Sequence, residues 1–286
     1  MITRFAPSPT GPLHLGHAWS ATRAHDLARA RDGTFLLRIE DIDRQRSKPE
    51  WEAQLKDDLR WLGISWDAES MRQSDRMAAY AAALDGLWDR GLLYPCTCTR
   101  RDIAAALSAP QEGAGPDGPV YPGTCRPTDG ASVTGPRPEN VHLRLHIARA
   151  LAGIEDDLSF AETGPFAPGT VRTAPSAYRD RIGDVVLARK DFGTSYHLSV
   201  VLDDAAQGVT HVVRGADLFE ATPIHVLLQH LLGVSTPVYH HHELIRDAAG
   251  TRLAKRDDAR SIASYRAAGW NAAALLDRLR ARPVAP

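Results

Sequence analysis

Residues 1–40 contain the pattern that most restricts the fold of this chain. A short apolar run at residues 2–6 predicts a buried strand, and the proline- and glycine-rich residues 7–12 predict a loop after it. Apolar residues then recur at helical spacing from Leu15 until Asp32-Gly33, and residues 34–39 form a second apolar run. Strand, loop, helix and strand in this order form a βαβ unit. We therefore expect an α/β fold with a parallel sheet that carries the loop at its carboxyl edge.

The rest of the chain continues this alternation around one atypical segment. Residues 97–138 are rich in glycine and proline and poor in large apolar residues. We interpret this segment, together with its continuation to about Ser176, as an insertion into the core. Around it we predict helices at residues 51–62, 75–90 and 221–232, and strands at residues 184–188, 196–202, 209–214 and 238–245.

Composition limits the cellular setting and the kind of partner. The 286 residues carry a net charge of −1, and no apolar run approaches the roughly 18 residues that a membrane span needs. The N-terminus lacks the long apolar stretch of a signal peptide, so we expect a cytoplasmic protein without a membrane partner. We also expect a monomer. Between His241 and Pro286, nine Lys and Arg residues stand against five Asp and Glu residues. This basic end is either a contact surface for phosphates or a solvated helical surface, and composition alone favours the second.

Two histidines stand where the first loop becomes a helix. His14 and His17 are spaced i, i+3 and share one face of the helix start, where N–H groups and the positive helix end attract anions. Gly16 between them removes a side chain where a flat base can pack against the backbone. Two imidazoles at this place can donate hydrogen bonds to the α-phosphate of a triphosphate. The spacing alone also fits half of a metal site or a structural pair, and the βαβ setting favours phosphate chemistry.

The same residues carry a resemblance to a known family. His14-Leu15-Gly16-His17, with residues 7–11 before it, resembles the first signature of the class I aminoacyl-tRNA synthetases in its glutamyl form. Residues 252–256 occupy the position of the second signature, Lys-Met-Ser-Lys-Ser. Lys255 matches the second lysine of this signature, whereas an alanine replaces its serine. The resemblance implies that ATP, with its Mg²⁺, is bound by His14, Gly16, His17 and Lys255. It implies that His14, His17 and Lys255 are catalytic.

A pocket for glutamate needs cations for two carboxylates and an anion for the ammonium group. Arg4 lies on the first strand and Glu40 ends the next, so the switch-point rule brings both to one crevice. Taken alone, the acidic residues 40–43 more often form a helix start or a solvated turn. Residues 38–43, Arg-x-Glu-Asp-x-Asp, closely resemble glutamyl-tRNA synthetases. This resemblance implies a glutamate site made of Arg4, Ala6, Ser8, Glu40, Tyr196 and Arg214.

The resemblance also assigns a role to the residues of this site. It implies that Ser8 and Glu40 contact the ammonium group, while the arginines and the tyrosine bind the carboxylates. Full-length enzymes of the family carry an asparagine four residues after this tyrosine, and Val200 stands at that position here. A lost hydrogen bond is worth about 0.5–1.5 kcal/mol, so we expect weaker glutamate binding.

Three cysteines, Cys96, Cys98 and Cys125, are the only ones in the chain. An odd number with a Cys-x-Cys pair argues against a disulfide framework and fits either a zinc site or reduced, buried thiols. A structural zinc needs a fourth ligand, for which Asp102, Asp117 or water are candidates on general grounds. In the related short enzymes a tyrosine four residues before the last cysteine fills this place, which implies a structural Zn²⁺ bound by Cys96, Cys98, Tyr121 and Cys125.

The whole chain resembles the short members of the family, the glutamyl-queuosine tRNA(Asp) synthetases. Only about thirty residues follow Lys255, too few for the anticodon-reading domains of longer members. This resemblance implies tRNA-independent activation of L-glutamate with ATP, and transfer of the glutamate to the queuosine base at the wobble position of tRNA(Asp). The alternatives are a truncated glutamyl-tRNA synthetase that charges a tRNA 3′ end, and a non-catalytic relative that binds ATP or tRNA.

The resemblance also implies a division of the chain. We expect a class I synthetase Rossmann-like core in residues 1–92 and 177–236, and an inserted zinc-binding connective subdomain in residues 93–176. Residues 237–286 are expected to hold the second-signature loop and a helical stem-contact region, which would be the RNA surface.

Overall fold

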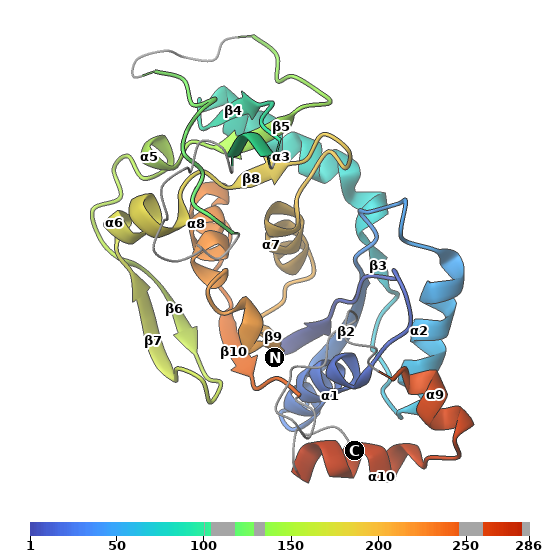
Figure 1. Ribbon diagram of the computed structural model, residues 1–286. Helices are drawn as coiled ribbons and strands as arrows, with labels where there is room; N and C mark the ends of the chain where they lie inside the picture. Colours follow the sequence, from blue (N-terminus) through green and yellow to red (C-terminus); the bar gives the residue numbers. More distant parts are fainter. Residues whose placement is uncertain (100, 104–117, 129–134, 246–259, 282–286) are drawn as a thin grey trace.

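The computed structural model describes residues 1–99, 101–103, 118–128, 135–245 and 260–281 (Figure 1). Its strands are β1 (Ile2–Phe5), β2 (Thr34–Ile39), β3 (Met71–Arg72), β4 (Leu93–Cys96), β5 (His142–Leu145), β6 (Leu158–Glu162), β7 (Gly169–Thr173), β8 (Val186–Ala188), β9 (His211–Gly215) and β10 (Val238–His242). Its α-helices are α1 (Leu15–Arg29), α2 (Pro49–Trp61), α3 (Met77–Asp89), α5 (Ile147–Ala150), α6 (Pro175–Ala177), α7 (Tyr196–Ala206), α8 (Thr222–Leu232), α9 (Ile262–Ala267) and α10 (Ala272–Ala281). Short helical turns are η1 (Gln73–Arg76), η2 (Tyr178–Ile182) and η3 (Ala216–Leu218).

The central layer is a parallel sheet, as the βαβ pattern predicts. Strands β1, β2 and β3 pair in parallel, and so do β9, β10 and β6, while β7 is antiparallel to β6. The two halves meet at β1 and β9, where the N–H of Thr210 donates to the carbonyl of Ile2 at 3.0 Å. The chain reverses its winding direction at this junction, so the junction is where an open α/β sheet forms a ligand crevice at its carboxyl edge.

Helix α1 covers the first half of the sheet and delivers its N-terminus to that edge. Its buried alanines Ala18, Ala21, Ala24 and Ala28 let the helix lie close to β1 and β2. Strand β2 is buried along Phe35–Ile39, as a strand covered on both faces must be. Helix α10 lies beside α1 and α9 lies beside α2, and together they add the side chains of Ile262, Tyr265 and Leu279 to the same apolar core.

One predicted element is wrong. Residues 196–202 are not a strand but the first part of α7. The run Val200-Val201-Leu202 has strand-like composition, but the hydroxyl of Ser195 caps a helix by accepting from the N–H of Leu198, and Leu198 and Val201 then face the same apolar cluster. Helical spacing of the buried side chains decides the structure here, over the local β preference of valine. The other predicted helices and strands correspond to α2, α3, α8, β8, β9 and β10.

A second, small sheet lies apart from the central layer. Strands β4, β5 and β8 pair antiparallel, and β4 ends at Cys96. The hairpin of β6 and β7 belongs instead to the central sheet, where β6 pairs with β10, although both strands come from the glycine- and proline-rich region and its continuation. Among the described residues, every helix is too short or too polar to span a bilayer.

Candidate active site

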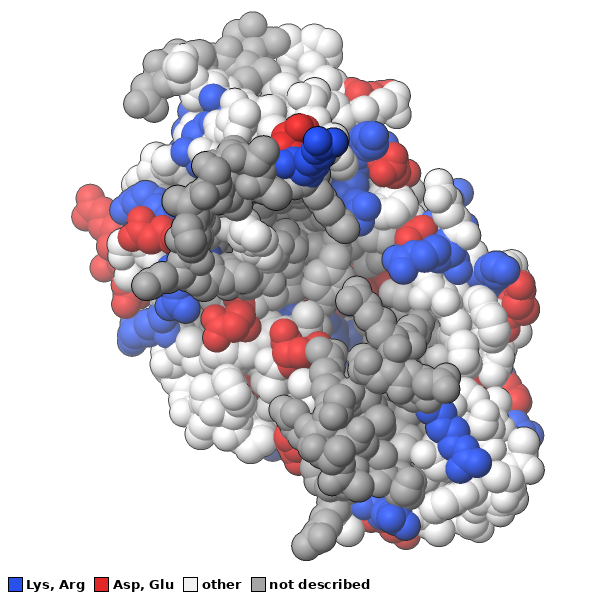
Figure 2. Space-filling model, viewed as in Figure 1, with Lys and Arg blue, Asp and Glu red and all other residues white. Residues whose placement is uncertain are grey.

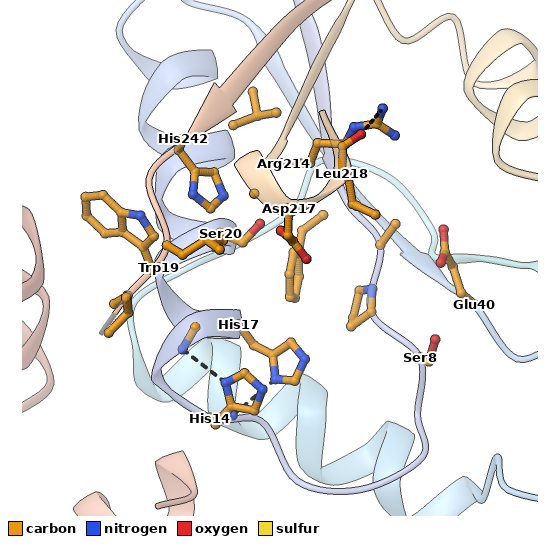
Figure 3. A pocket seen from close by; sticks show the side chains of 18 of the residues that line it. Ser8, His14, His17, Trp19, Ser20, Glu40, Arg214, Asp217, Leu218 and His242 are labelled. Carbon is orange, nitrogen blue, oxygen red and sulfur yellow. Dashed lines mark hydrogen bonds between the residues drawn. The ribbon is translucent and has the colours of Figure 1, made fainter. Parts of the chain in front are cut away.

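A cavity of about 450 Å³ opens at the junction of the two half-sheets (Figure 3). Its walls come from the carboxyl ends of β1 and β9, the start of α1, the residue after β2 and the first turn of α7. Every described residue that the sequence predicts for ATP or glutamate lines it: Arg4, Ala6, Ser8, His14, Gly16, His17, Glu40, Tyr196 and Arg214. Lys255 lies outside the described residues.

The two histidines lie side by side at the start of α1, with ring centroids 3.8 Å apart. The N–H of Gly16 donates to Nδ1 of His14 at 3.1 Å, and the N–H of His14 donates to Nδ1 of His17 at 3.2 Å. Because each Nδ1 accepts a hydrogen bond, a neutral ring carries its proton on Nε2. The hydrogen bonds that cap α1 thus leave the proton of each neutral ring on Nε2. An Nε2–H group at a helix start is a suitable donor to a phosphate oxygen.

A buried cluster of charges supports two residues of the cavity lining, Arg4 and Glu40. Asp204 on α7 accepts from Nε of Arg4 at 2.8 Å and from Arg38 at 2.7 Å, and Arg38 also meets Glu40 at 3.4 Å. Burial alone would raise the pKa of the Asp204 carboxyl, but the two guanidinium groups lower it below its ordinary value. Asp204 therefore stays ionised and holds Arg4, which keeps N–H groups for a ligand because Asp204 and the Val213 carbonyl take only three of its five.

Glu40 is the carboxylate of this cluster that lines the cavity. Burial raises its pKa, and the neighbouring Arg38 and Arg4 offset this effect only in part. A cation placed in the cavity would favour the ionised form of this side chain. Glu40 is therefore suited to receive an ammonium group.

Tyr196 and Arg214 also line the cavity. Burial raises the pKa of the Tyr196 phenol, so the group is neutral and can donate its proton. Arg214 is 4% exposed, and its guanidinium donates to His241, His225 and Thr222. Two positive side chains, Arg4 and Arg214, thus reach one cavity from neighbouring strands, which suits a ligand with two carboxylates.

Further residues line the cavity that the sequence pattern did not single out. They are Phe5, Pro7, Thr10, Trp19, Ser20, Val213, Gly215, Asp217, Leu218, His242, Leu244 and Ile245. A Cβ at Gly215 would lie 2.4 Å from Oδ1 of Asp217 and 2.9 Å from Cδ2 of Leu244, so a larger residue there would displace these two side chains. The sequence Arg214-Gly215-Ala216-Asp217 holds the signal for this wall, since it directly follows a predicted strand.

The three cysteines lie together, away from the cavity. Their sulfur atoms are all within 4.8 Å of one another, and the Tyr121 hydroxyl is 3.5 Å from Sγ of Cys96 and 3.3 Å from Sγ of Cys98. Burial raises the pKa of the Cys125 thiol, but hydrogen bonds from Tyr121 and the backbone N–H of Thr97 lower it to about 6. Three thiol groups at this spacing, one of them readily ionised, can hold a metal ion, as the sequence predicts.

The predicted RNA surface is described in part, over residues 237–245 and 260–281. On the face in Figure 2 as a whole, Lys and Arg side chains are interspersed with Asp and Glu. In the described part of the basic end, Arg266 pairs with Asp57 at 2.7 Å and Arg280 pairs with Asp26 at 2.9 Å. These two cations are thus partly neutralised by the core, and the RNA contact of this region stays a prediction.

Comparison with known proteins places this site in a family. The chain matches the class I tRNA synthetases (E and Q), catalytic domain, over residues 1–286, and it belongs to this family. It is 63% identical over 275 residues to a glutamyl-Q tRNA(Asp) synthetase from Rhodobacter capsulatus, an alignment that covers 94% of this chain and 96% of that protein. A glutamyl-Q tRNA(Asp) synthetase from Geobacter sulfurreducens is 41% identical, with 93% and 79% covered. The predicted resemblance to this enzyme family is confirmed.

A solved structure supports the same fold. The crystal structure of a glutamate tRNA ligase from Elizabethkingia meningosepticum in complex with its amino acid aligns with a TM-score of 0.75 at 25% identity. The alignment covers 97% of this chain and 59% of that one, so this chain corresponds to part of the longer ligase. The prediction of a class I synthetase fold with a parallel sheet is confirmed, whereas the boundaries of the predicted domains remain predictions.

Proposed function

We propose that this chain uses ATP to activate L-glutamate and transfers the glutamate to the queuosine base of tRNA(Asp). One observation carries the proposal. A single cavity collects the paired histidines at a helix start, a buried carboxylate and two arginines, which together match ATP and an amino acid with two carboxylates. The names of the relatives at 63% and 41% identity support the choice of the modified tRNA as acceptor.

The chemistry has two steps. The α-carboxylate of glutamate attacks the α-phosphate of ATP, the bond to the β-phosphate breaks, and glutamyl-adenylate and pyrophosphate form. A hydroxyl of the queuosine cyclopentene ring then attacks the activated carbonyl, an ester forms, and AMP leaves. Mg²⁺, when bound with ATP, neutralises charge on the phosphates.

The residues of the cavity act on the first step. His14 and His17 donate their Nε2 protons toward the phosphate oxygens, where negative charge grows as the new bond forms. Gly16 leaves room for the nucleotide beside them, and Lys255 is proposed to stabilise the departing pyrophosphate. Much of the acceleration then comes from holding the carboxylate and the phosphate in line.

The glutamate is proposed to lie across the cavity. Glu40 and Ser8 receive its ammonium group on the side of β1 and β2, and Ala6 forms the small contact beside them. Arg4, Tyr196 and Arg214 bind the two carboxylates. This arrangement sets opposite charges against both ends of the substrate, so it discriminates against amino acids that lack a side-chain carboxylate.

The cysteine cluster is proposed to be a structural zinc site with Cys96, Cys98, Cys125 and Tyr121 as ligands. The contact of the tyrosine hydroxyl with two of the sulfurs supports a fourth ligand at this position. Zn²⁺, when bound, would fix strand β4 to residues 121–125, a segment with few apolar side chains of its own. The cytoplasmic location and the monomeric state remain predictions from the sequence.

Two assays test the proposed function. Exchange of pyrophosphate into ATP is expected with L-glutamate in the absence of tRNA, and its absence would favour a binding protein without chemistry. Labelled glutamate is expected to attach to tRNA(Asp) that carries queuosine and not to unmodified tRNA(Asp). Charging of tRNA(Glu) at its 3′ end would instead support the truncated glutamyl-tRNA synthetase.

A further inference from the structure

A line of buried polar side chains crosses three neighbouring strands behind the cavity. Glu162 ends β6, His241 lies on β10, and Arg214 lies on β9 directly opposite His241 in the register of the sheet. Oε2 of Glu162 is 2.5 Å from Nδ1 of His241, and Nε2 of the same imidazole is 3.1 Å from Nε of Arg214. Glu162 and His241 lie outside the cavity lining, and both side chains are fully buried.

The direction of these hydrogen bonds is fixed by chemistry. A guanidinium group has only donors, so Nε2 of His241 must accept from Arg214 and carries no proton. The imidazole is therefore neutral, with its proton on Nδ1, and it donates this proton to the Glu162 carboxylate. Burial and the charge of Arg214 lower the pKa of His241 to about 4, which agrees with a neutral ring at physiological pH.

The carboxylate at the start of this line is itself held in place. Oε1 of Glu162 accepts from the backbone N–H of Gly164 at 2.6 Å and from that of His241 at 2.9 Å. A Cβ on Gly164 would come within 2.2 Å of the His241 carbonyl and 2.8 Å of Oε1 of Glu162, so only glycine permits this close approach. The geometry of the pair is thus set by backbone groups of two strands.

Arg214 is held from its other side as well. Its NH1 group contacts Nδ1 of His225 at 3.0 Å, and its NH2 group donates to Oγ1 of Thr222 at 2.8 Å. The guanidinium of Arg214 is therefore bound at Nε, NH1 and NH2, and it reaches the cavity in one orientation (Figure 3). Side chains that fix a binding group in this way reduce the entropy that the group loses when a ligand binds.

We propose that Glu162 and His241 are positioning residues that orient Arg214 for one carboxylate of the substrate, with Glu162 selecting the imidazole tautomer. This inference rests on the proposed glutamate site. It assigns a task in substrate recognition to a residue of the β6–β7 hairpin, which lies outside the cavity.

The Glu162→Gln variant tests the proposal with almost no change of shape. The amide oxygen can still accept from both backbone N–H groups, which leaves the amide nitrogen facing His241. The amide N–H at position 162 would then donate to Nδ1 of His241, so the ring proton would move to Nε2. At Nε2 it would face the N–H of Arg214, and the hydrogen bond between His241 and Arg214 would be lost. We expect the glutamate KM in pyrophosphate exchange to rise about tenfold to a hundredfold, the range that loss of one hydrogen bond to a charged group allows, with kcat and the ATP KM within about twofold.

Two controls separate positioning from a merely structural role. Glu220→Gln, an exposed carboxylate beside α8, is expected to leave the glutamate KM unchanged. His241→Gln can keep an acceptor near the former Nε2, whereas His241→Asn can only face Glu162, so the Asn variant should lose more glutamate affinity than the Gln variant. Equal KM values for these two His241 variants, or a normal glutamate KM in Glu162→Gln together with a lowered melting temperature, would overturn the proposal.

A spectroscopic measurement keeps this inference distinct from the proposed function. Nitrogen-15 chemical shifts of His241 report which ring nitrogen carries the proton. We expect a protonated Nδ1 in the unaltered chain and a protonated Nε2 in Glu162→Gln. An unchanged tautomer in the variant refutes the positioning role of Glu162. Loss of glutamate-dependent exchange in the unaltered chain, by contrast, refutes the proposed function.

Discussion

Single residues in this site are held by partners that are distant in the sequence. Arg4 is 200 positions from Asp204, and Glu162 is 79 positions from His241. The resemblance to the synthetases predicted the cavity residues, because each lies in a short segment that matches the family. Asp204 and Glu162 could not be predicted as the partners of Arg4 and His241. The sequence around a carboxylate does not indicate which distant arginine or histidine it will contact in the folded chain.

Glu40 leads to a prediction about pH. Burial raises its pKa above the ordinary value, and the ammonium group of bound glutamate would lower it again. Binding therefore favours the ionised carboxylate, so the glutamate affinity should fall up to tenfold per pH unit once the pH is below the raised pKa of the free protein. Calorimetric titration between pH 8 and pH 5 measures this dependence. Glu40→Gln should bind weakly and without this slope, and an equal slope in that variant would contradict the assignment.

At the scale of elements, the same contrast between local and distant information decides which predictions succeed. Helix α1 was predictable because its apolar spacing, its glycine stop and the loop before it all lie within one short segment. Helix α7 was not, because its valine-rich first half favours a strand, and the helix is selected by the packing of Leu198 and Val201 in the apolar cluster that α7 shares with α8. The β6–β7 hairpin was not either, because β6 joins the central sheet through β10, far along the chain.

Helix α2 contains a buried carboxylate, Asp58, whose charge the nearby Arg266 compensates only in part. Asp58 is 2% exposed, and within the described part of the chain its Oδ2 has no hydrogen-bond partner. Burial, and next the negative charge of Asp57, raise the pKa of Asp58 to about 6. Since this folded value lies above the ordinary one of 3.8, the ionised group destabilises the protein most above pH 6 and not at all below both values.

Asp58→Asn is therefore expected to stabilise the protein at pH 7. About two pKa units correspond to about 3 kcal/mol, and partial relaxation reduces the expected gain to about 1–3 kcal/mol. The gain should shrink as the pH falls from 6 toward 4, because both the folded and the unfolded carboxyl then become protonated. Urea unfolding at pH 7 and pH 4.5 measures it, with Glu69→Gln, an exposed carboxylate in the segment after α2, as the control. A gain that is equal at both pH values would show that the carboxylate charge is not its cause.

Across the whole molecule, the cysteine cluster is joined to the core through Asp184. This fully buried carboxylate, just before β8, accepts from the hydroxyl of Tyr94, from Nε of Arg126 at 2.6 Å and from the N–H of Ile147 at 2.9 Å. Arg144 adds a second link, since it donates to Sγ of Cys96 at 3.3 Å and to the Asp184 carbonyl at 2.7 Å. The cluster can therefore brace the small sheet without touching the cavity.

This separation predicts the effect of metal removal. Cys98→Ser replaces a soft ligand and should reduce zinc in the purified protein from about one ion per chain to well below that value, as measured by atomic spectroscopy. The melting temperature should fall because binding of the ion stabilises the folded chain, while the glutamate KM should stay within about twofold, because the cavity is lined by other elements. Thr97→Ser, an exposed change between the two cysteines, should keep both metal and stability. If Cys98→Ser stayed fully folded and lost pyrophosphate exchange, the metal would have a part in the chemistry that the distance between cluster and cavity argues against.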